Sequence, residues 1–315
     1  MIKIRNILKD HYDLDIINVL PQKGGWAALA YKVYDNKAAY FLKFYEKSRA
    51  STAKWTAHID QYVPILVWLM HNSSLKGKIP VPILTKKGDY KCEDAAGVYL
   101  LYEYIDGETI GDKDLNKEQI YHLSEIVTEL HTYGEEIPIQ TDAIKENFHV
   151  PFLPELRNSL DEENNLIPVD LREVMNPHIE QIRGLIDTVE QLSVRLKTDN
   201  VRMALCHTDL HNWNLMQSEQ HLMLIDWEGL KLAPVEADMM FLVDKPYFDE
   251  FLSIYQNLHK DFVMNLDVLQ FYKGRRKLED IWEFMEQLLF DKQDGEERVF
   301  TINLLAAELR EIDVK

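Results

Sequence analysis

The residues best suited to chemistry lie in one segment, Leu205–Trp227, which reads LCHTDLHNWNLMQSEQHLMLIDW. An apolar run leads to Asp209 and Asn214, and a second apolar run, after a short polar turn, leads to Asp226. Strand-like runs around a polar turn predict a hairpin, which would bring these side chains to one edge of a sheet. Carboxylate and amide oxygens suit Mg²⁺, whose remaining partners are often phosphate oxygens. The segment therefore predicts Asn214 and Asp226 as metal ligands and Asp209 as the acceptor of a hydroxyl proton.

Each of these residues has a simpler explanation when it is taken alone. His207 and Asp209 would then cap a turn, and Asp226 would merely end a strand. The combination of all of them at this spacing, between two apolar runs, is what favours a site that handles phosphate.

The pattern His-x-Asp-x-x-x-x-Asn followed by Ile-Asp-Trp resembles the catalytic and metal-binding segments of the aminoglycoside phosphotransferases. The resemblance covers most of the chain and, in LKDHYDLDI, HTDLHNWN and YKGRRKLEDI, is greatest to the spectinomycin phosphotransferase branch. It implies an α+β, bilobal, protein-kinase-like fold with a small antiparallel-sheet N-lobe and a larger, mostly helical C-lobe. Residues 1–105 would form the nucleotide-binding lobe and end in a hinge, and residues 106–315 would form the catalytic and substrate-binding lobe. His207 would belong to the catalytic residues and fix the loop.

Composition limits the classes of partner. The chain has 315 residues, enough for one large domain or two lobes, and its formal net charge is −18. Phosphate contacts to nucleic acid need clustered Lys and Arg, so this balance argues against a nucleic-acid-binding role. It is compatible with a cationic small substrate, although on net charge alone an ordinary solvated acidic surface is the better explanation.

Two cysteines, Cys92 and Cys206, are too few for a disulfide framework. The N-terminal residues lack the long apolar stretch of a signal peptide. The most apolar window, YVPILVWLM, is too short to span a bilayer. We therefore expect a cytoplasmic protein without membrane segments.

The first fifty residues predict a short helix over residues 2–10 and then three antiparallel strands. The turn Gln22–Trp26 between the first two strands contains Gly24 and Gly25. Glycines let backbone N–H groups approach phosphates closely, so this turn is a candidate cover for a nucleotide. The alternative is an ordinary hairpin turn.

Lys43 lies in the third predicted strand, in the apolar stretch FLKFY. A lysine on an apolar strand is costly unless its ammonium group finds a partner. The resemblance implies that Lys43 contacts the α- and β-phosphates of the nucleotide, as the third-strand lysine of protein-kinase-like folds does. The alternative is an edge-strand lysine that faces water.

The carboxylate partner of this lysine is left open by the sequence. The family supplies a helical glutamate, but the expected position falls on or near Gln61, which cannot neutralise an ammonium group. Asp60 and Glu46 are the alternatives. Pro64 biases the preceding residue away from helical geometry, so this helix is expected to start late.

Further along, the strand VYLLYEYI would lead into the hinge. By the resemblance, Glu103, Tyr104 and Ile105 would offer backbone groups to adenine. Asn116 and Gln119 then form a capping-box pattern that predicts the start of a helix, and His131 at the end of that helix is expected to be packed rather than functional. Residues 134–170 form either a substrate lid or an insertion.

Three residues are candidates for substrate binding. Trp213 stands next to Asn214, where many relatives have glycine, and is expected to shape the substrate side of the loop. Glu279 and Asp280 lie near the start of a late amphipathic helix, where the family often binds substrate ammonium groups; the alternative is a solvated helix face. Asp238 begins an apolar stretch and is expected to cap a helix.

The resemblance implies a kinase that uses ATP (or GTP) and Mg²⁺ to phosphorylate a hydroxyl of a small, cationic aminoglycoside or aminocyclitol such as spectinomycin. Kinases for choline, homoserine, methylthioribose or macrolides share the motifs and stay open as alternatives. So does a non-catalytic, nucleotide-binding pseudokinase, although Asp209, Asn214 and Asp226 argue against it. The sequence leaves open whether the protein is a monomer or a dimer.

Overall fold

The computed structural model describes residues 2–22, 27–161, 167–219 and 221–312. The chain divides into two compact units. The first unit comprises residues 1–48, 52–145 and 203–263, and the second comprises residues 49–51, 146–202 and 264–315. The strands of the predicted N-lobe and the segment Leu205–Trp227 therefore belong to the same unit.

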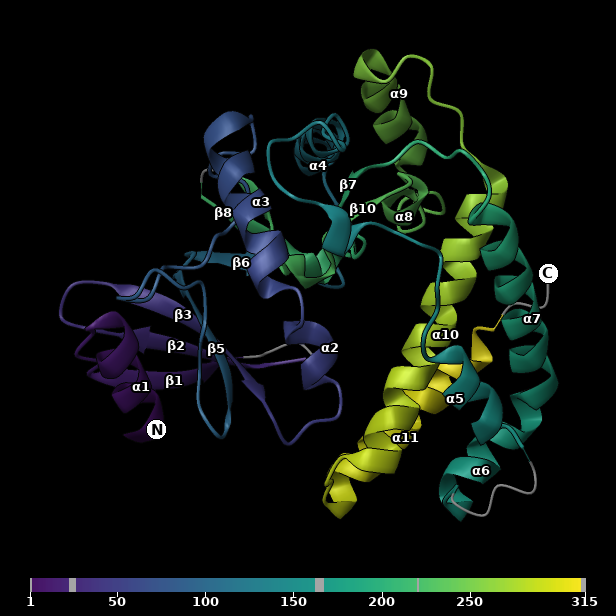
Figure 1. Ribbon diagram of the computed structural model, residues 1–315, viewed down its shortest axis with the longest axis horizontal. Helices are drawn as coiled ribbons and strands as arrows, with labels where there is room; N and C mark the ends of the chain where they lie inside the picture. The colour runs from purple at the N-terminus through teal and green to yellow at the C-terminus, as the bar shows by residue number, and fades with distance from the viewer. Residues whose placement is uncertain (1, 23–26, 162–166, 220, 313–315) are drawn as a thin grey trace. The chain divides into compact units, whose positions relative to one another are not determined.

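The first unit begins with a helix and a five-stranded antiparallel sheet (Figure 1). The sheet has the order β1-β2-β3-β5-β4, and its strands are β1 Asn18–Gln22, β2 Leu29–Tyr34, β3 Ala39–Glu46, β4 Cys92–Glu93 and β5 Gly97–Glu103. Helix α1 (Ile2–Tyr12) packs on the sheet, because Ile4 and Leu8 share a buried core with Val33 and Leu42. The predicted helix and the three antiparallel strands are confirmed.

Successive side chains of β3 point to opposite faces of the sheet. Leu42 is fully buried in the core beneath α1. Lys43 therefore projects from the other face, where its register partners are Ala30 on β2 and Leu100 on β5. The alternation of the strand thus places one ammonium group on the face away from α1.

Helix α3 (Ile59–Asn72) corrects one sequence expectation. It begins at Ile59 and contains Pro64, so the prediction that the helix starts late is wrong. The backbone N–H groups of Gln61 and Tyr62 already bond to the carbonyl of His58 and close the first turn. Pro64 removes a single intrahelical hydrogen bond, and the apolar residues buried along the helix offset that loss.

The rest of the first unit consists of short sheets and helices. The strands are β6 Gly107–Thr109, β7 Ala204–Cys206, β8 Leu215–Ser218, β9 Leu222–Leu224 and β10 Lys231–Ala233; the helices are α2 Thr52–Thr56, α4 Lys117–Leu130, α8 Glu236–Met239 and α9 Phe248–Leu258; and the 3-10 turns are η1 Asp142–Ile144, η3 Asn212–Asn214 and η4 Trp227–Gly229. The predicted capping box of Asn116 and Gln119 opens α4. The turn predicted before Asp226 is that of the β8–β9 hairpin, which β6 extends. The first strand of this hairpin is Leu215–Ser218 and not, as expected, the apolar run before His207, which forms β7 and pairs with β10.

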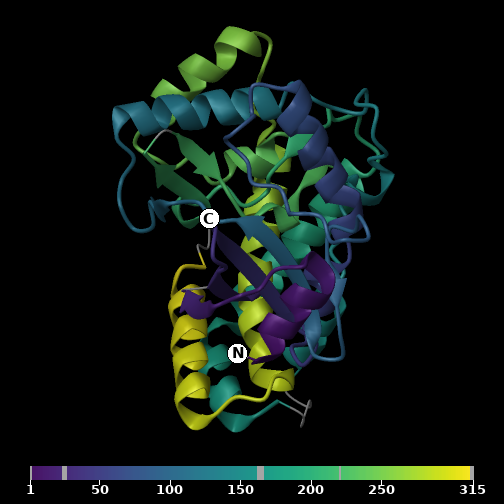
Figure 2. The same ribbon diagram turned by 90° about the vertical axis from the view of Figure 1, so that its left-hand side faces the viewer.

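The second unit is helical. Its elements are α5 Leu153–Ser159, α6 Val169–Met175, η2 Asn176–His178, α7 Ile179–Leu196, α10 Leu266–Phe290 and α11 Gly295–Arg310. Helix α10 packs against both α7 and α11 (Figure 2). The buried Glu146 joins the start of the unit to α10, because it accepts hydrogen bonds from the N–H of Phe148 and from Arg275.

Residues 134–170, the predicted lid or insertion, contain η1 and α5. Residues 162–166 lie outside the described residues.

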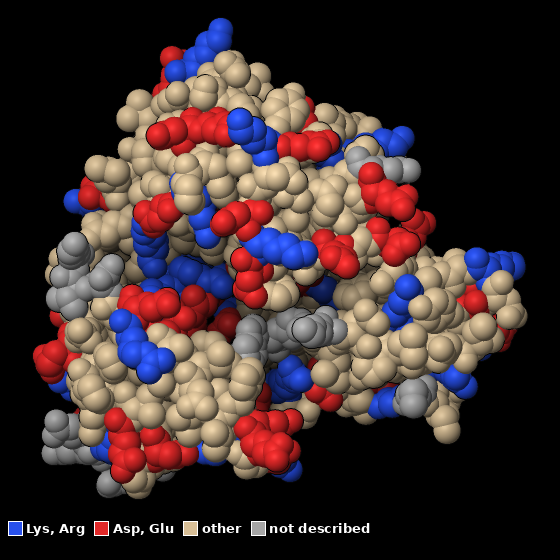
Figure 3. Space-filling model, turned by 180° about the vertical axis from the view of Figure 1, so that it is seen from behind, with Lys and Arg blue, Asp and Glu red and all other residues tan. Residues whose placement is uncertain are grey.

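The surface reflects the composition. Acidic side chains are spread over the face shown in Figure 3, with basic side chains among them. Among the described helices, none combines the length and the apolar character needed to cross a membrane. Both cysteines, Cys92 and Cys206, are buried and free.

Two glycines of the second unit give a matched test of its packing. A Cβ at Gly274 on α10 would lie 2.8 Å from Val189 Cγ2 on α7, whereas a Cβ at Gly184 would meet nothing within 4 Å. Gly274→Ala should lower the free energy of unfolding by about 1–3 kcal/mol through overpacking. Gly184→Ala should raise it by about 0.5–1 kcal/mol through helix propensity. Urea denaturation measures both, and equal effects of the two changes would contradict this packing.

Candidate active site

The β8–β9 hairpin brings the two predicted metal ligands to one end of the sheet. Leu215 pairs with Leu224, and the N–H of Ile225 donates to the carbonyl of Asn214 at 2.9 Å. Asn214 therefore precedes one strand at the point where Asp226 follows the other. The β8–β9 hairpin, whose turn and second strand were predicted but whose first strand was not, is what places these two side chains at the same edge.

Asn214 is oriented by Asp209. Its amide nitrogen donates to the backbone carbonyl of Asp209 at 2.9 Å and to the Asp209 carboxylate at 2.8 Å. With the nitrogen used in this way, the amide oxygen is the atom that Asn214 can offer to a cation. Together with the carboxylate of Asp226 it forms a donor set of hard oxygens, which fits Mg²⁺.

The ammonium group of Lys43 lies between two carboxylates. Its Nζ is 2.8 Å from Oδ1 of Asp226 and 2.5 Å from Oε1 of Glu228, and the hydroxyl of Tyr45 donates to the same Glu228 oxygen. The side chains of Lys43 and Glu228 are 12% and 7% exposed. Burial opposes the charge of Lys43, but Asp226 and Glu228 outweigh it and raise the pKa of Lys43 well above its usual value. Burial likewise opposes the charge of Glu228, and Lys43 holds the pKa of Glu228 below its usual value.

Sequence reasoning missed Glu228. The partners considered for Lys43 were Glu46, Asp60 and Gln61, but Asp60 pairs with Lys91 at 2.6 Å. The amide of Gln61 is oriented toward the carbonyls of Ala57 and His58 at the start of its own helix. The available signal was an acidic residue two positions after Asp226, in a turn that the hairpin brings to the lysine.

His207 connects the candidate catalytic loop, which comprises residues 207–214, to Ile225, the residue after β9. Its Nε2 donates to the carbonyl of Ile225 at 2.9 Å, and its Nδ1 accepts the N–H of Asp209 at 3.3 Å. The ring is fully buried, and burial lowers the pKa of His207 despite the nearby carboxylates of Asp238 and Asp209. A neutral imidazole with one donor and one acceptor satisfies both contacts.

Two residues of the site have left-handed backbone conformations. The φ angles are 67° at Thr208 and 64° at Asp226. This region is costly for a β-branched residue such as Thr208 and is found mostly where function requires it. Thr208 is held by its hydroxyl, which donates to the carbonyl of Gly229 at 2.7 Å. A Cβ at Gly229 would lie 2.7 Å from that hydroxyl oxygen and 3.0 Å from the carbonyl oxygen of His207, so the two loops touch closely there.

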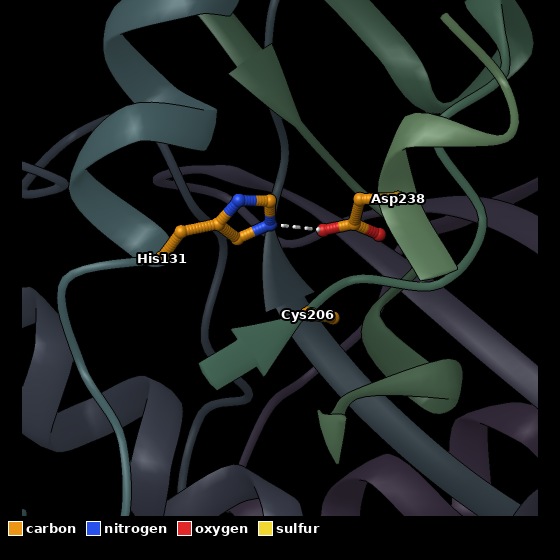
Figure 4. Close-up of side chains that lie close together, drawn as sticks. All are labelled: His131, Cys206 and Asp238. Carbon is orange, nitrogen blue, oxygen red and sulfur yellow. Dashed lines mark hydrogen bonds and ion pairs between the residues drawn. The ribbon is translucent and has the colours of Figure 1, made fainter. Parts of the chain in front are cut away.

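Asp238 anchors the catalytic loop, and the prediction that it caps a helix is wrong. It lies inside α8, and its carboxylate accepts the N–H groups of His207 at 3.0 Å and Thr208 at 2.6 Å. Its Oδ2 also lies 2.9 Å from Nε2 of His131 (Figure 4). The cap of α8 is Val235, which makes no side-chain cap bond. His131 is buried, as expected for a packed residue.

The candidate hinge follows β5. The N–H of Tyr104 donates to the carbonyl of Ala39 at 3.2 Å, so the sheet already uses that amide. The Tyr104 ring lies 3.6 Å from Nζ of Lys32. Glu103 ends β5, and Ile105 connects it toward β6. The other predicted nucleotide contacts, Gly24 and Gly25, lie outside the described residues.

The candidate substrate residues fall in both units. In the first unit, the half-exposed ring of Trp213 lies over Gly111, where a Cβ would be 3.2 Å from the ring. Glu279 and Asp280 are on α10 of the second unit. Burial raises the pKa of Asp280 to about 7, although Arg276, 2.9 Å away, opposes this shift.

Comparisons with known proteins give the family and the fold of this chain. The sequence profile of the phosphotransferase enzyme family matches residues 18–270. This chain belongs to that family. It is therefore a phosphotransferase. No curated protein sequence matches the chain at a significant level.

Solved structures show that this phosphotransferase has the expected protein-kinase-like fold. A spectinomycin phosphotransferase in complex with ADP and spectinomycin aligns with a TM-score of 0.74 at 22% identity, over 98% of this chain and 97% of the other. A microcompartment-associated aminopropanol kinase aligns with a TM-score of 0.65 at 12% identity, over 99% and 96%. A choline kinase from Streptococcus pneumoniae aligns with a TM-score of 0.55 at 18% identity, over 98% of both chains.

The assignment of Asp209 as the proton acceptor predicts a selective loss. Asp209→Asn keeps an oxygen for the Asn214 amide but removes the base, so turnover should fall about 10²–10⁴-fold. Nucleotide affinity should stay near that of the wild type. ADP release and calorimetric titration with ADP measure the two quantities, and Asp261→Asn, an exposed carboxylate of the same unit, is the control. Near-normal turnover of Asp209→Asn would remove Asp209 from this role.

The anchoring role of Asp238 predicts a loss of stability and activity together. The Asp238 carboxylate accepts hydrogen bonds from His207, Thr208 and His131. In Asp238→Asn an NH₂ group replaces one carboxylate oxygen, so a buried N–H donor of the protein would face a second donor instead of an acceptor. We expect the free energy of unfolding to fall by about 3 kcal/mol. Turnover should fall as well, because the backbone of the catalytic loop loses its anchor. Urea denaturation and steady-state kinetics check this, and unchanged stability would contradict the anchoring role.

Proposed function

We propose that this phosphotransferase transfers the γ-phosphoryl group of ATP to a hydroxyl of an aminocyclitol or aminoglycoside such as spectinomycin. The observation that carries the proposal is the similarity, over nearly the whole of both chains, to a spectinomycin phosphotransferase bound to ADP and spectinomycin. The gathering of Lys43, Asp209, Asn214 and Asp226 in one unit supports the same chemistry.

In the proposed reaction, the substrate hydroxyl oxygen forms a bond to the γ-phosphorus while the bond from that phosphorus to the bridging oxygen breaks, and ADP leaves. Asp209 orients the hydroxyl and accepts its proton. Lys43 holds the phosphate oxygens and balances their charge. Because the transition state is loose, positioning and charge neutralisation supply most of the rate enhancement.

Asn214 and Asp226 are the residues proposed to hold Mg²⁺. A bound divalent cation supplies further charge neutralisation at the phosphate oxygens. In this proposal Glu103, Tyr104 and Ile105 form the hinge that recognises adenine through the backbone, and Gly24 and Gly25 cover the phosphates.

The acidic balance of the chain supports a cationic substrate. A net charge of −18 attracts polyamines and amino sugars and speeds their approach. Glu279 and Asp280 are the proposed ammonium-binding carboxylates, and Trp213 is the proposed boundary of the substrate site. The buried Asp280, with its raised pKa, would regain its charge beside a cation.

A smaller amino alcohol is the second candidate substrate, because an aminopropanol kinase and a choline kinase also share the fold. Their substrates, like spectinomycin, carry both a hydroxyl and a cationic nitrogen. The two candidates differ mainly in the size of the acceptor that the enzyme accommodates.

A substrate panel separates these candidates. Purified protein with Mg²⁺ and ATP should release ADP rapidly with spectinomycin or a related aminocyclitol, and slowly with choline, aminopropanol, homoserine, methylthioribose or a macrolide. The Asp209→Asn variant is the inactive control. Expression in a susceptible bacterium should also raise the spectinomycin concentration that stops growth. Turnover restricted to an amino alcohol would transfer the proposal to the second candidate.

A further inference from the structure

Lys43 contacts two carboxylates of the turn after β9, and one of them, Asp226, is a proposed metal ligand. From the contacts of Glu228 we infer that this residue is the positioning carboxylate for Lys43, and that helix α3 does not contribute one. The inference rests on the use of a nucleotide by this phosphotransferase. It does not depend on which hydroxyl compound accepts the phosphoryl group.

Strand β3 presents two groups to Glu228. Lys43 and Tyr45 are two residues apart, so their side chains lie on the same face of the strand. Both reach the same oxygen, Oε1 of Glu228. Lys43 and Tyr45, both on β3, thus hold the Glu228 carboxylate in one position. The carboxylate held in this way determines where the Lys43 ammonium group lies. The pair is largely buried, and a charge-assisted hydrogen bond is stronger there than in water.

Helix α3 contributes no charged side chain to the described contacts of Lys43 and Glu228. Asp60 is paired with Lys91, and Gln61 is oriented toward the carbonyls that begin the helix. The residue of α3 that lies near this cluster is Tyr62, a buried phenol whose pKa is raised first by burial and then by the negative charge of Glu228. Its hydroxyl has no hydrogen-bond partner within the described part of the chain. The role of a helical glutamate is therefore filled from the η4 turn.

The second contact of Lys43 explains why this arrangement matters. Asp226 also binds the ammonium in this structure, yet Asp226 is a proposed metal ligand. If it were the only carboxylate, the ammonium and the cation would compete for it. Glu228 lies two residues further along, so it retains Lys43 when Asp226 turns to the cation. One short turn then aligns the phosphate-binding lysine and a metal ligand together.

A purely structural role for Glu228 makes a different prediction. If Glu228 only balanced a buried charge, its removal would lower stability and would not weaken nucleotide binding. Loss of a negative charge beside the phosphates would even strengthen binding. Positioning predicts the opposite sign, because Lys43 would be displaced toward Asp226.

A double-mutant cycle of Lys43→Met and Glu228→Gln tests the inference. Each variant is titrated with ADP in the presence of Mg²⁺, and the slow hydrolysis of ATP without acceptor is measured beside it. In the wild-type background, Glu228→Gln should weaken ADP binding about tenfold or more, as expected when a charged hydrogen bond is lost. In the Lys43→Met background the same change should alter binding less than about twofold. Unchanged or tighter binding by Glu228→Gln, or an equal loss in both backgrounds, would overturn the inference.

A pair of phenol deletions keeps the inference testable if Glu228→Gln fails to fold. Tyr45→Phe removes a hydrogen bond to Glu228 and should weaken ADP binding severalfold, whereas Tyr62→Phe removes an unpartnered hydroxyl and should not. Asp60→Asn and Gln61→Glu, both on α3, are controls that should leave binding and hydrolysis unchanged. A loss with Asp60→Asn, or equal effects of the two phenol deletions, would return the positioning role to the helix. Substrate turnover enters none of these measurements, so their outcome is independent of the proposed acceptor.

Discussion

The candidate active site depends on keeping one largely buried ammonium group charged. A lysine in a low-dielectric environment loses its proton unless carboxylates compensate for the lost hydration. Lys43 meets this requirement with Asp226 and Glu228, which approach it from a turn that follows β9. Lys43 can contact both carboxylates only if the sheet holds β3 next to this turn. The β8–β9 hairpin must also end just before Asp226.

A second set of buried contacts supports the turn and the catalytic loop. Asp238 accepts the backbone N–H groups of His207 and Thr208, and His207 reaches the carbonyl just before Asp226. Thr208 and Asp226 both have positive φ angles. Such conformations persist only where surrounding bonds determine them fully. The strained backbone at Thr208 and Asp226 is the free-energy cost of holding the side chains of Asp209, Asn214 and Asp226 in place before a substrate binds.

Much of this arrangement could be predicted from the sequence because it is encoded locally. Alternating strands, the capping box at Asn116 and the hairpin before Asp226 all depend on neighbouring residues. Family membership and the kinase-like fold, expected from HTDLHNWN and IDW, are confirmed. The roles given to Asp209, Asn214 and the hinge remain predictions.

The predictions from sequence that failed concern features that tertiary contacts determine. Pro64 was expected to delay a helix, but the burial of its neighbours outweighs one lost hydrogen bond. Asp238 was expected to cap a helix, but a carboxylate can also reach backbone amides thirty residues away along the chain. Glu228 escaped notice because its partner is 185 residues away in sequence. Periodicity and spacing contain no information about such distant pairings.

The contact between Gly229 and Thr208 also restricts how this enzyme can evolve. Any side chain at position 229 would enter space that the Thr208 hydroxyl and the His207 carbonyl already occupy. A side chain at position 229 is therefore tolerated only after the loop at Thr208 has moved or lost its hydroxyl, so the effect of a change at 229 depends on the residue at 208. A homologue with a side chain at position 229 should differ at position 208 or in the path of that loop, and its residue 229 introduced here alone would be harmful.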